Sequence, residues 1–221
     1  MECLLKVGCN PTINNSRIYG LLQSPLYLAI EKSNLKILKL LLERDANVNL
    51  RYILETPLHY AIWRQGDQQI IKELLDHGAD SDGKNDNKVT PMLRALQHNR
   101  IDIAKILLEY NADVNIPCYF VGHTALHQMA LRGDLEAVEF LLQNGAHVDK
   151  AGNENVTPLF ECLNIPKDLI YIAQTLLKHG ANINYPCVES EQTVLHHAVY
   201  RGKPKIVEFL LKHDADQCFR L

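Results

Sequence analysis

The sequence lacks the features that would direct it to a membrane, a secretory route or a nucleic acid. No apolar run approaches the roughly 18–20 residues that cross a bilayer, and the first residues have neither the basic start nor the long apolar stretch of a secretory signal. A net charge of −3, from 23 Lys plus Arg against 26 Asp plus Glu, gives no general attraction for nucleic acid or an anionic membrane. We therefore expect no nucleic-acid partner and no membrane contact.

Catalytic and redox signatures are also absent. The six cysteines include no C-x-x-C pair, which is typical of a reducing compartment and predicts a cytoplasmic or nuclear protein. There is no G-x-G-x-x-G, P-loop or G-x-S-x-G motif, so we expect no cofactor and no enzymatic activity. The composition, 47% hydrophobic and 22% charged, is nevertheless that of a chain that buries a core.

What the sequence does contain is a repeat. A six-residue motif recurs at 24, 56, 90, 124, 157 and 193, at intervals of 32, 34, 34, 33 and 36, as SPLYLA, TPLHYA, TPMLRA, TALHQM, TPLFEC and TVLHHA. A second signature of the type LLxxGAxxN follows each copy, and the extra residues of the longer copies fall around Gly66–Asp67 and Asn164–Lys167. Insertions at connections, and not within helices, are what a helical repeat predicts.

These motifs resemble the ankyrin repeat, whose period is about 33 residues and whose signature is T-P-L-H-x-A. The resemblance implies an all-α fold, an ankyrin-repeat solenoid of antiparallel helix pairs joined by β-hairpin-like loops. It places six repeats in one continuous solenoid over residues 21–221. It also places a half repeat and loop over 1–20, where LLKVGCNPTIN matches the second signature.

Local chemistry agrees with this fold. A threonine before the first helical turn can cap an N–H group, and proline fits the first helical position. The second helices end in Gly78, Gly145, Gly180 or Asn111, residues that tolerate the left-handed conformation. An alanine follows in every copy, a small residue where backbones must come close.

The N-terminal half repeat suggests a larger parent. The half repeat has no first helix, and its Leu4, Leu5 and Val7 do not provide the polar cap that terminal repeats normally carry. We expect the chain to be part of a longer array. A half-repeat cap, or burial of this end against a partner, remains open as an alternative.

The ten histidines raise the question of a metal or catalytic site. His59, His127 and His196 occupy the T-x-L-H position, where the resemblance implies a hydrogen bond near the threonine that ties neighbouring repeats. Successive repeats lie roughly 10 Å apart, so His59 and His127 are about 20 Å apart and cannot share a metal ion. His123 and His127 have i, i+4 spacing, but His123 lies before the capping Thr124 in a loop. We expect structural histidines and no metal site.

Partner binding is expected at positions that depart from the repeat consensus. The resemblance to the ankyrin repeat implies that these positions are the exposed ends of the first helices and the loop tips, which line the concave side. Aromatic residues and arginine at such positions are typical of interface hot spots. The predicted residues at the helix ends are Trp63, Arg64, His98, Leu131, Arg132, Tyr200 and Arg201.

Three loop tips are apolar or aromatic, and from them we predict contributions from Tyr52, Ile53, Tyr119 and Phe120. The alternative is that these side chains fold back onto neighbouring loops. Together with Arg64, Arg132 and Arg201, the loop residues predict a partner protein whose binding segment mixes apolar and acidic groups. A monomer is expected.

The resemblance also implies a modification. Asparagines in the LL…(D/N)-(V/I)-N context of ankyrin repeats are substrates of an asparaginyl hydroxylase, and Asn115 in LLEYNADVN is the closest match, ahead of Asn49 and Asn184. The alternative is a purely structural hydrogen bond within the loop.

The sequence thus predicts a non-catalytic scaffold or adaptor that binds another protein. The alternative is the recognition arm of a larger protein, such as a ubiquitin-ligase receptor, toxin or channel, whose active module lies outside this chain.

Overall fold

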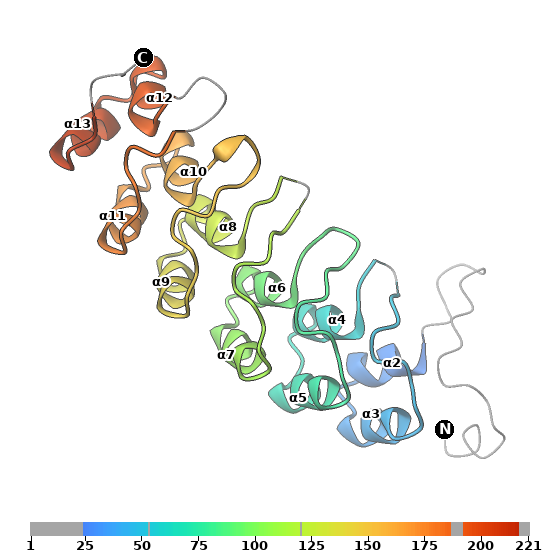
Figure 1. The fold of residues 1–221 in the computed structure, drawn as a ribbon. Helices are drawn as coiled ribbons and strands as arrows, with labels where there is room; N and C mark the ends of the chain where they lie inside the picture. The colour runs from blue at the N-terminus through green and yellow to red at the C-terminus, as the bar shows by residue number, and fades with distance from the viewer. Residues whose placement is uncertain (1–23, 53, 120, 187–191, 217–221) are drawn as a thin grey trace. The chain divides into compact units, whose positions relative to one another are not determined.

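The computed structural model describes residues 24–52, 54–119, 121–186 and 192–216. These residues form twelve α-helices, α2 to α13, together with one short 3-10 turn (η1, Asn153–Asn155) and no strand (Figure 1). The predicted all-α class is confirmed. The predicted half repeat over residues 1–20 lies outside the described residues. The chain divides into two compact units, Met1–Asp113 and Val114–Leu221.

The first unit holds three helix pairs. The first helices of the pairs pack side by side in one layer, α2 against α4 and α4 against α6, and the second helices form the other layer in the order α3, α5, α7. Their bounds are α2 (Pro25–Glu31), α3 (Leu35–Leu42), α4 (Pro57–Trp63), α5 (Gln68–Asp76), α6 (Pro91–Gln97) and α7 (Ile101–Glu109).

The second unit repeats this arrangement. Helix α10 packs between α8 and α12, and α9 contacts α11. The bounds are α8 (Ala125–Arg132), α9 (Leu135–Gln143), α10 (Pro158–Asn164), α11 (Ile170–Lys178), α12 (Val194–Tyr200) and α13 (Pro204–Lys212). The insertions at Gly66–Asp67 and Asn164–Lys167 fall in or next to the connections between helices of a pair, as the repeat pattern predicts.

The first helices begin as predicted. The side chain of Thr56 accepts from the backbone N–H of His59 at 3.4 Å, and Thr90 and Thr157 make the equivalent bond at 3.3 Å. Each bond pairs one of the N–H groups that a helix start leaves without an intrahelical acceptor. Ser24, in the same position before α2, makes no side-chain capping bond.

The second helices end in the left-handed conformation. Gly78 has φ +83° and Asn111 has φ +61°, as their residue types predict. The same position is occupied by Asp45 and Asp214, each at φ +61°, which the sequence pattern did not single out. Asparagine and aspartate tolerate this conformation better than other non-glycine residues.

The loops between repeats are hairpin-like. The N–H of Tyr52 donates to the carbonyl of Glu55 at 2.9 Å and the reverse bond is 3.2 Å long. A single bond of the same kind runs from Asn85 to the Val89 carbonyl at 3.0 Å. These loops confirm the predicted connection without forming an extended strand.

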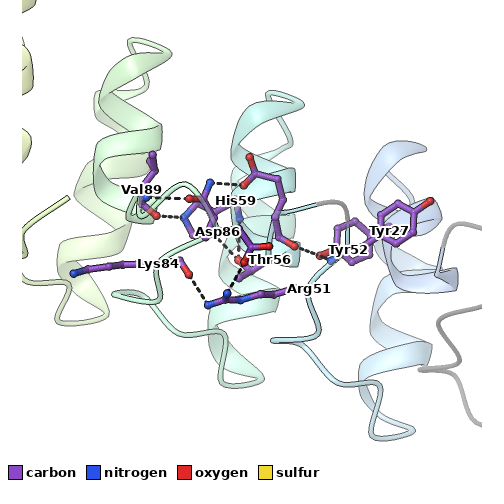
Figure 2. Close-up of polar contacts among 10 residues, drawn as sticks. Tyr27, Arg51, Tyr52, Thr56, His59, Lys84, Asp86 and Val89 are labelled. Atoms are coloured by element: carbon purple, nitrogen blue, oxygen red, sulfur yellow. Dashed lines mark hydrogen bonds and ion pairs between the residues drawn. The ribbon is translucent and has the colours of Figure 1, made fainter. Parts of the chain in front are cut away.

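Side chains tie the second repeat to the third. The Nε2 of His59 lies 2.8 Å from the Val89 carbonyl, and Arg51 donates to Asp86 at 2.6 Å and to the Lys84 carbonyl at 2.7 Å (Figure 2). Because a carbonyl can only accept, the neutral imidazole carries its proton on Nε2, and Nδ1 accepts from the Thr56 hydroxyl at 2.7 Å.

A second tie uses the last residue of each signature. The amide of Asn49 donates to the Gly78 carbonyl and accepts from the Asp80 N–H, both at 2.9 Å. In the next copy Asp82 accepts from the Asp113 N–H at 2.9 Å. The pattern thus recurs with either residue type, because both offer an oxygen acceptor.

Candidate functional site

The end of α4 presents an aromatic and a cationic side chain together. Trp63, its last residue, is 47% exposed, and the guanidinium of Arg64 lies over the indole ring, 5.7 Å from the ring centroid. This is the geometry of a cation–π contact, which holds both side chains in place before any partner arrives.

Trp63 continues a row of aromatic rings across the first unit. Ring centroids are 5.2 Å apart from Tyr52 to Tyr27, 5.2 Å from Tyr27 to Tyr60, and 5.7 Å from Tyr60 to Trp63. Tyr27 is buried, and its hydroxyl lies 2.7 Å from the Glu55 carbonyl and accepts from the Tyr52 N–H at 3.1 Å. Figure 2 shows Tyr27 and Tyr52 lying side by side at the start of this row.

A recess of about 480 Å³ opens beside these rings, within the first unit. Its volume lies in the range of pockets that hold small ligands or side chains. The lining comes from α2, α4, α6 and the loop before α4: Glu31, Tyr52, Glu55, Tyr60, Trp63, Arg64 and Arg94.

The charged side chains of the recess differ in how many hydrogen bonds and ion pairs they form. Glu55 is paired with Arg94 and also accepts from the side-chain amide of Asn85 at 2.9 Å. From the part of the chain that the structure describes, Glu31 receives a single long bond of 3.5 Å, from the Tyr60 hydroxyl, and it lies 3.7 Å from Lys32. Burial and the nearby Glu31 charge raise the pKa of Tyr60.

Arg94 is largely buried and only partly satisfied. Its side chain is only 16% exposed, and Nη2 pairs with Glu55. Among the described residues its Nε, which is buried, has no hydrogen-bond partner. A buried donor without an acceptor costs about 1–3 kcal/mol, so this guanidinium favours an additional acceptor.

The other predicted helix-end residues are not among those that line this recess. His98, which follows α6, and Leu131 in α8 are half-buried, whereas Arg132 is exposed. Tyr200, at the end of α12, is 90% exposed, with the exposed Arg201 after it. In each unit, therefore, at least one aromatic–arginine pair is on the surface.

The loop residues are placed differently from one another. Tyr52 is half-buried against Tyr27, so this side chain does fold back onto a neighbouring repeat while still lining the recess. Tyr119 is half-buried, and its backbone φ is +56°. Ile53 and Phe120, also predicted to contact a partner, lie outside the described residues.

His59 and His127, two histidines of the T-x-L-H position, have both ring nitrogens engaged. His127 repeats the geometry of His59, with Nε2 3.0 Å from the Val156 carbonyl and Nδ1 3.0 Å from the Thr124 hydroxyl. Burial lowers the pKa of His59 and of His127 to about 4. Within the described residues, no group of three or more His, Cys, Asp or Glu side chains is placed to hold a metal ion.

Asn115 has the structural bonds that the alternative interpretation requires. Its side-chain amide donates to the Gly145 carbonyl at 3.0 Å and accepts from the His147 N–H at 2.8 Å. The amide thus ties one repeat to the next, as Asn49 does. Hydroxylation of Asn115 stays a prediction, and the mass of one added oxygen atom on its peptide from native protein would test it.

Sequence reasoning missed Glu55, Tyr60 and Arg94. Tyr60 and Arg94 both occupy the x of the T-P-L-H-x-A motif, the one position that the motif leaves free. That freedom was the available signal. In the structure these two positions of adjacent repeats contribute to the same recess.

Models of ankyrin repeats match almost the whole chain, over residues 1–85, 53–118 and 117–187 in one case and 170–211 in another. The chain therefore belongs to the ankyrin-repeat family. It is an ankyrin-repeat domain, a fold that generally serves as a non-catalytic protein–protein interaction module. None of the helices among the described residues is long and apolar enough to cross a bilayer.

Two relatives illustrate the range of this family. The chain is 30% identical over 199 residues to the transient receptor potential cation channel subfamily A member 1 of Homo sapiens, covering 83% of this chain and 17% of that protein. It is 30% identical over 209 residues to the B-cell lymphoma 3 protein homolog of Mus musculus, covering 87% of this chain and 44% of that protein. The chain thus spans less than half the length of both.

The fold is similar to a solved structure, the ankyrin repeat domain of Bcl-3, described as a unique member of the IkappaB protein family. The TM-score is 0.77 at 26% identity, covering 88% of this chain and 87% of that one. The likeness confirms the predicted solenoid class of helix pairs.

Proposed function

We propose that this chain is a scaffold or adaptor without catalytic activity, which binds a partner protein through the exposed first-helix ends and the loop tips. The observation that supports this most directly is the exposure of Trp63 and Tyr200 at positions where the repeat needs no aromatic residue. Large rigid side chains at such positions add nothing to the core, and they are the residue types that dominate binding hot spots.

The arginines beside these rings indicate the partner's chemistry. Arg64 and Arg201 directly follow Trp63 and Tyr200, and Arg132 occupies the equivalent position after Leu131. Apolar anchors on the partner would pack against the rings, and acidic groups would pair with the guanidinium groups. The binding segment therefore mixes apolar and acidic residues, and we place the protein in the cytoplasm or nucleus as a monomer without nucleic-acid or membrane contact.

Affinity capture followed by calorimetry tests this function. A partner identified by mass spectrometry is titrated against the chain and against Trp63→Ala, Arg64→Ala, Arg132→Ala and Tyr200→Ala. We expect at least one aromatic variant to lose about tenfold or more in affinity, the loss typical of a hot spot. Arg44→Ala, at an exposed arginine in the turn after α3, is the matched control. Unchanged affinity in all four variants would overturn the assignment of this surface.

The alternative function is a recognition arm of a larger protein. It is favoured by the share of each relative that the chain covers, 17% of the channel and 44% of the B-cell lymphoma 3 homolog. Immunoblotting of native extracts with an antibody to this chain distinguishes the two. A band much heavier than 25.1 kDa supports the arm, and a band at that mass supports the stand-alone adaptor.

A further inference from the structure

Two cations and two anions line the recess in the first unit: Arg64 and Arg94 against Glu31 and Glu55. Arg94 pairs with Glu55, and Glu31 lies 3.7 Å from Lys32, which does not line the recess. Arg64 is left as the lining cation without an ion pair among the described residues. An unpaired guanidinium favours an anionic group.

The two recess arginines also have unused hydrogen-bonding capacity. Arg94 makes one bond, from Nη2 to Glu55, and its buried Nε has no partner among the described residues. Arg64 forms no ion pair with any described residue and contacts the Trp63 ring. By contrast, Glu55 already accepts from two side chains, and Glu31 has both Lys32 and the Tyr60 hydroxyl nearby.

The rest of the recess is aromatic. Tyr52, Tyr60 and Trp63 supply ring surface beside the guanidinium groups. An apolar side chain could cover that surface, and the volume of about 480 Å³ leaves space for it next to a carboxylate. A purely cationic ligand would meet the rings and Glu31, but it would also meet Arg64 and Arg94.

We propose that this recess binds a partner segment in which an acidic side chain stands next to an apolar one. The carboxylate lies between the guanidinium groups of Arg64 and Arg94, and the apolar side chain packs on Trp63 and Tyr60. This deepens the proposed function and rests on it, because it assigns the partner's chemistry at one place on the binding surface.

Capped tetrapeptides, acetyl-Gly-Leu-Glu-Gly-amide and the versions with glutamine or lysine in place of glutamate, are suitable probes. Trp63 is the single tryptophan of the chain, so its indole N–H resonance reports on the recess in an NMR titration without ambiguity. We expect the glutamate peptide to shift this resonance and to bind more tightly than the glutamine peptide, with the lysine peptide weakest.

Charge variants of the full chain then test the sign of the interaction. Arg64→Gln should weaken binding of the glutamate peptide about fivefold, the size of a partly screened charge pair. Glu31→Gln should strengthen it, because the substitution removes a repelling carboxylate. Arg44→Gln removes an exposed arginine of the same unit that does not line the recess, and it should leave binding unchanged.

Three results would overturn the proposal: a lysine peptide that binds most tightly, equal responses to glutamate and glutamine, or no shift with any peptide. None of them would contradict the proposed function. That function fails only if the captured partner binds all of the surface variants with unchanged affinity, including Tyr200→Ala, which lies outside this recess.

Discussion

The position that is histidine in three of the six repeats makes the same kind of bond in Tyr27, His59 and His127. His59 reaches the Val89 carbonyl and His127 reaches the Val156 carbonyl. Tyr27, in the same position of the first motif, reaches the Glu55 carbonyl through its hydroxyl. Each acceptor directly precedes the capping threonine of the next repeat. Tyr27, His59 and His127 therefore each join two repeats through a hydrogen bond, whereas Leu93 and Phe160 at the same position have no polar side-chain atom to do so.

Removing the Tyr27 hydroxyl should destabilise the chain more than removing that of Tyr60. Tyr27→Phe leaves the Glu55 carbonyl and the Tyr52 N–H without this partner, at an expected cost of about 1–3 kcal/mol in the free energy of unfolding. Tyr60→Phe removes only a 3.5 Å bond to Glu31, and we expect a cost of about 0.5 kcal/mol or less. Urea unfolding of both variants checks this, and equal costs would contradict it.

The two buried histidines should make stability depend on pH. Burial lowers the pKa of His59 and His127 to about 4 in the folded chain, below the value of 6.5 expected in the unfolded chain. The unfolded state therefore binds protons more readily between these values. The stabilisation is fully present above pH 6.5 and falls as the pH drops from 6.5 to 4, by about 3 kcal/mol per histidine.

Urea unfolding at several pH values measures this effect. The double variant His59→Gln/His127→Gln should be less stable than the wild type at pH 7.5, because the ties to Val89 and Val156 are altered. Its stability should fall much less steeply below pH 6.5. The difference between the two profiles isolates the histidines from the carboxylates, and parallel profiles would show that other groups dominate.

At the scale of the element, the glycines differ in what surrounds them. Gly78 follows α5 at φ +83°, and a Cβ atom added there would meet nothing within 4 Å. Gly133 follows α8 at φ +80°, but a Cβ atom would lie 2.7 Å from Leu169 Cδ2 and 2.7 Å from the Tyr171 hydroxyl. Both positions need a left-handed backbone, but only Gly133 also lacks space for a Cβ atom.

Alanine substitutions separate these two requirements. Gly78→Ala should cost about 1–2 kcal/mol in the free energy of unfolding, the price of a left-handed alanine. Gly133→Ala should cost at least about 1 kcal/mol more, because Leu169 and Tyr171 must move and Tyr171 donates to the Gly133 carbonyl at 2.9 Å. Equal losses in chemical denaturation would mean that the Leu169 and Tyr171 side chains move aside without cost.

These elements also show which parts of the fold and of the candidate site could be predicted from the sequence alone. Helix starts such as Thr56 and helix ends such as Gly78 could be predicted because capping and left-handed turns depend on the residue itself and its near neighbours. Trp63 and Arg64 could be predicted as binding candidates because they depart from the consensus. The recess could not, because Tyr60 and Arg94 belong to different repeats and meet only through packing. The role of Tyr27 was hidden for the same reason, since its acceptor lies 28 residues away.

At the scale of the whole chain, the repeat pattern continues without interruption through the boundary between the two units. The signature LLEYNADVN spans residues 107–115, whereas the units divide between Asp113 and Val114. Repeat proteins are stabilised mainly by interfaces between neighbouring repeats. We propose, as the period predicts, that the six repeats of residues 21–221 form one solenoid whose unfolding is coupled along its length.

A destabilising substitution in the second unit should therefore also lower the urea midpoint of the first unit. Leu141 in α9 is fully buried, and Leu141→Ala should lower the free energy of unfolding by about 2–5 kcal/mol. Trp63 fluorescence reports only on the first unit, because Trp63 is the single tryptophan, whereas far-UV circular dichroism reports on all helices. If the repeats are coupled, Leu141→Ala shifts both urea midpoints downward together.

Leu58→Ala is the control: Leu58 lies in α4, the helix that carries Trp63, so this substitution must shift the fluorescence midpoint in either case. A Trp63 transition that stays at its wild-type midpoint while the circular dichroism transition splits would show two independently folding units, and the continuous solenoid would be wrong.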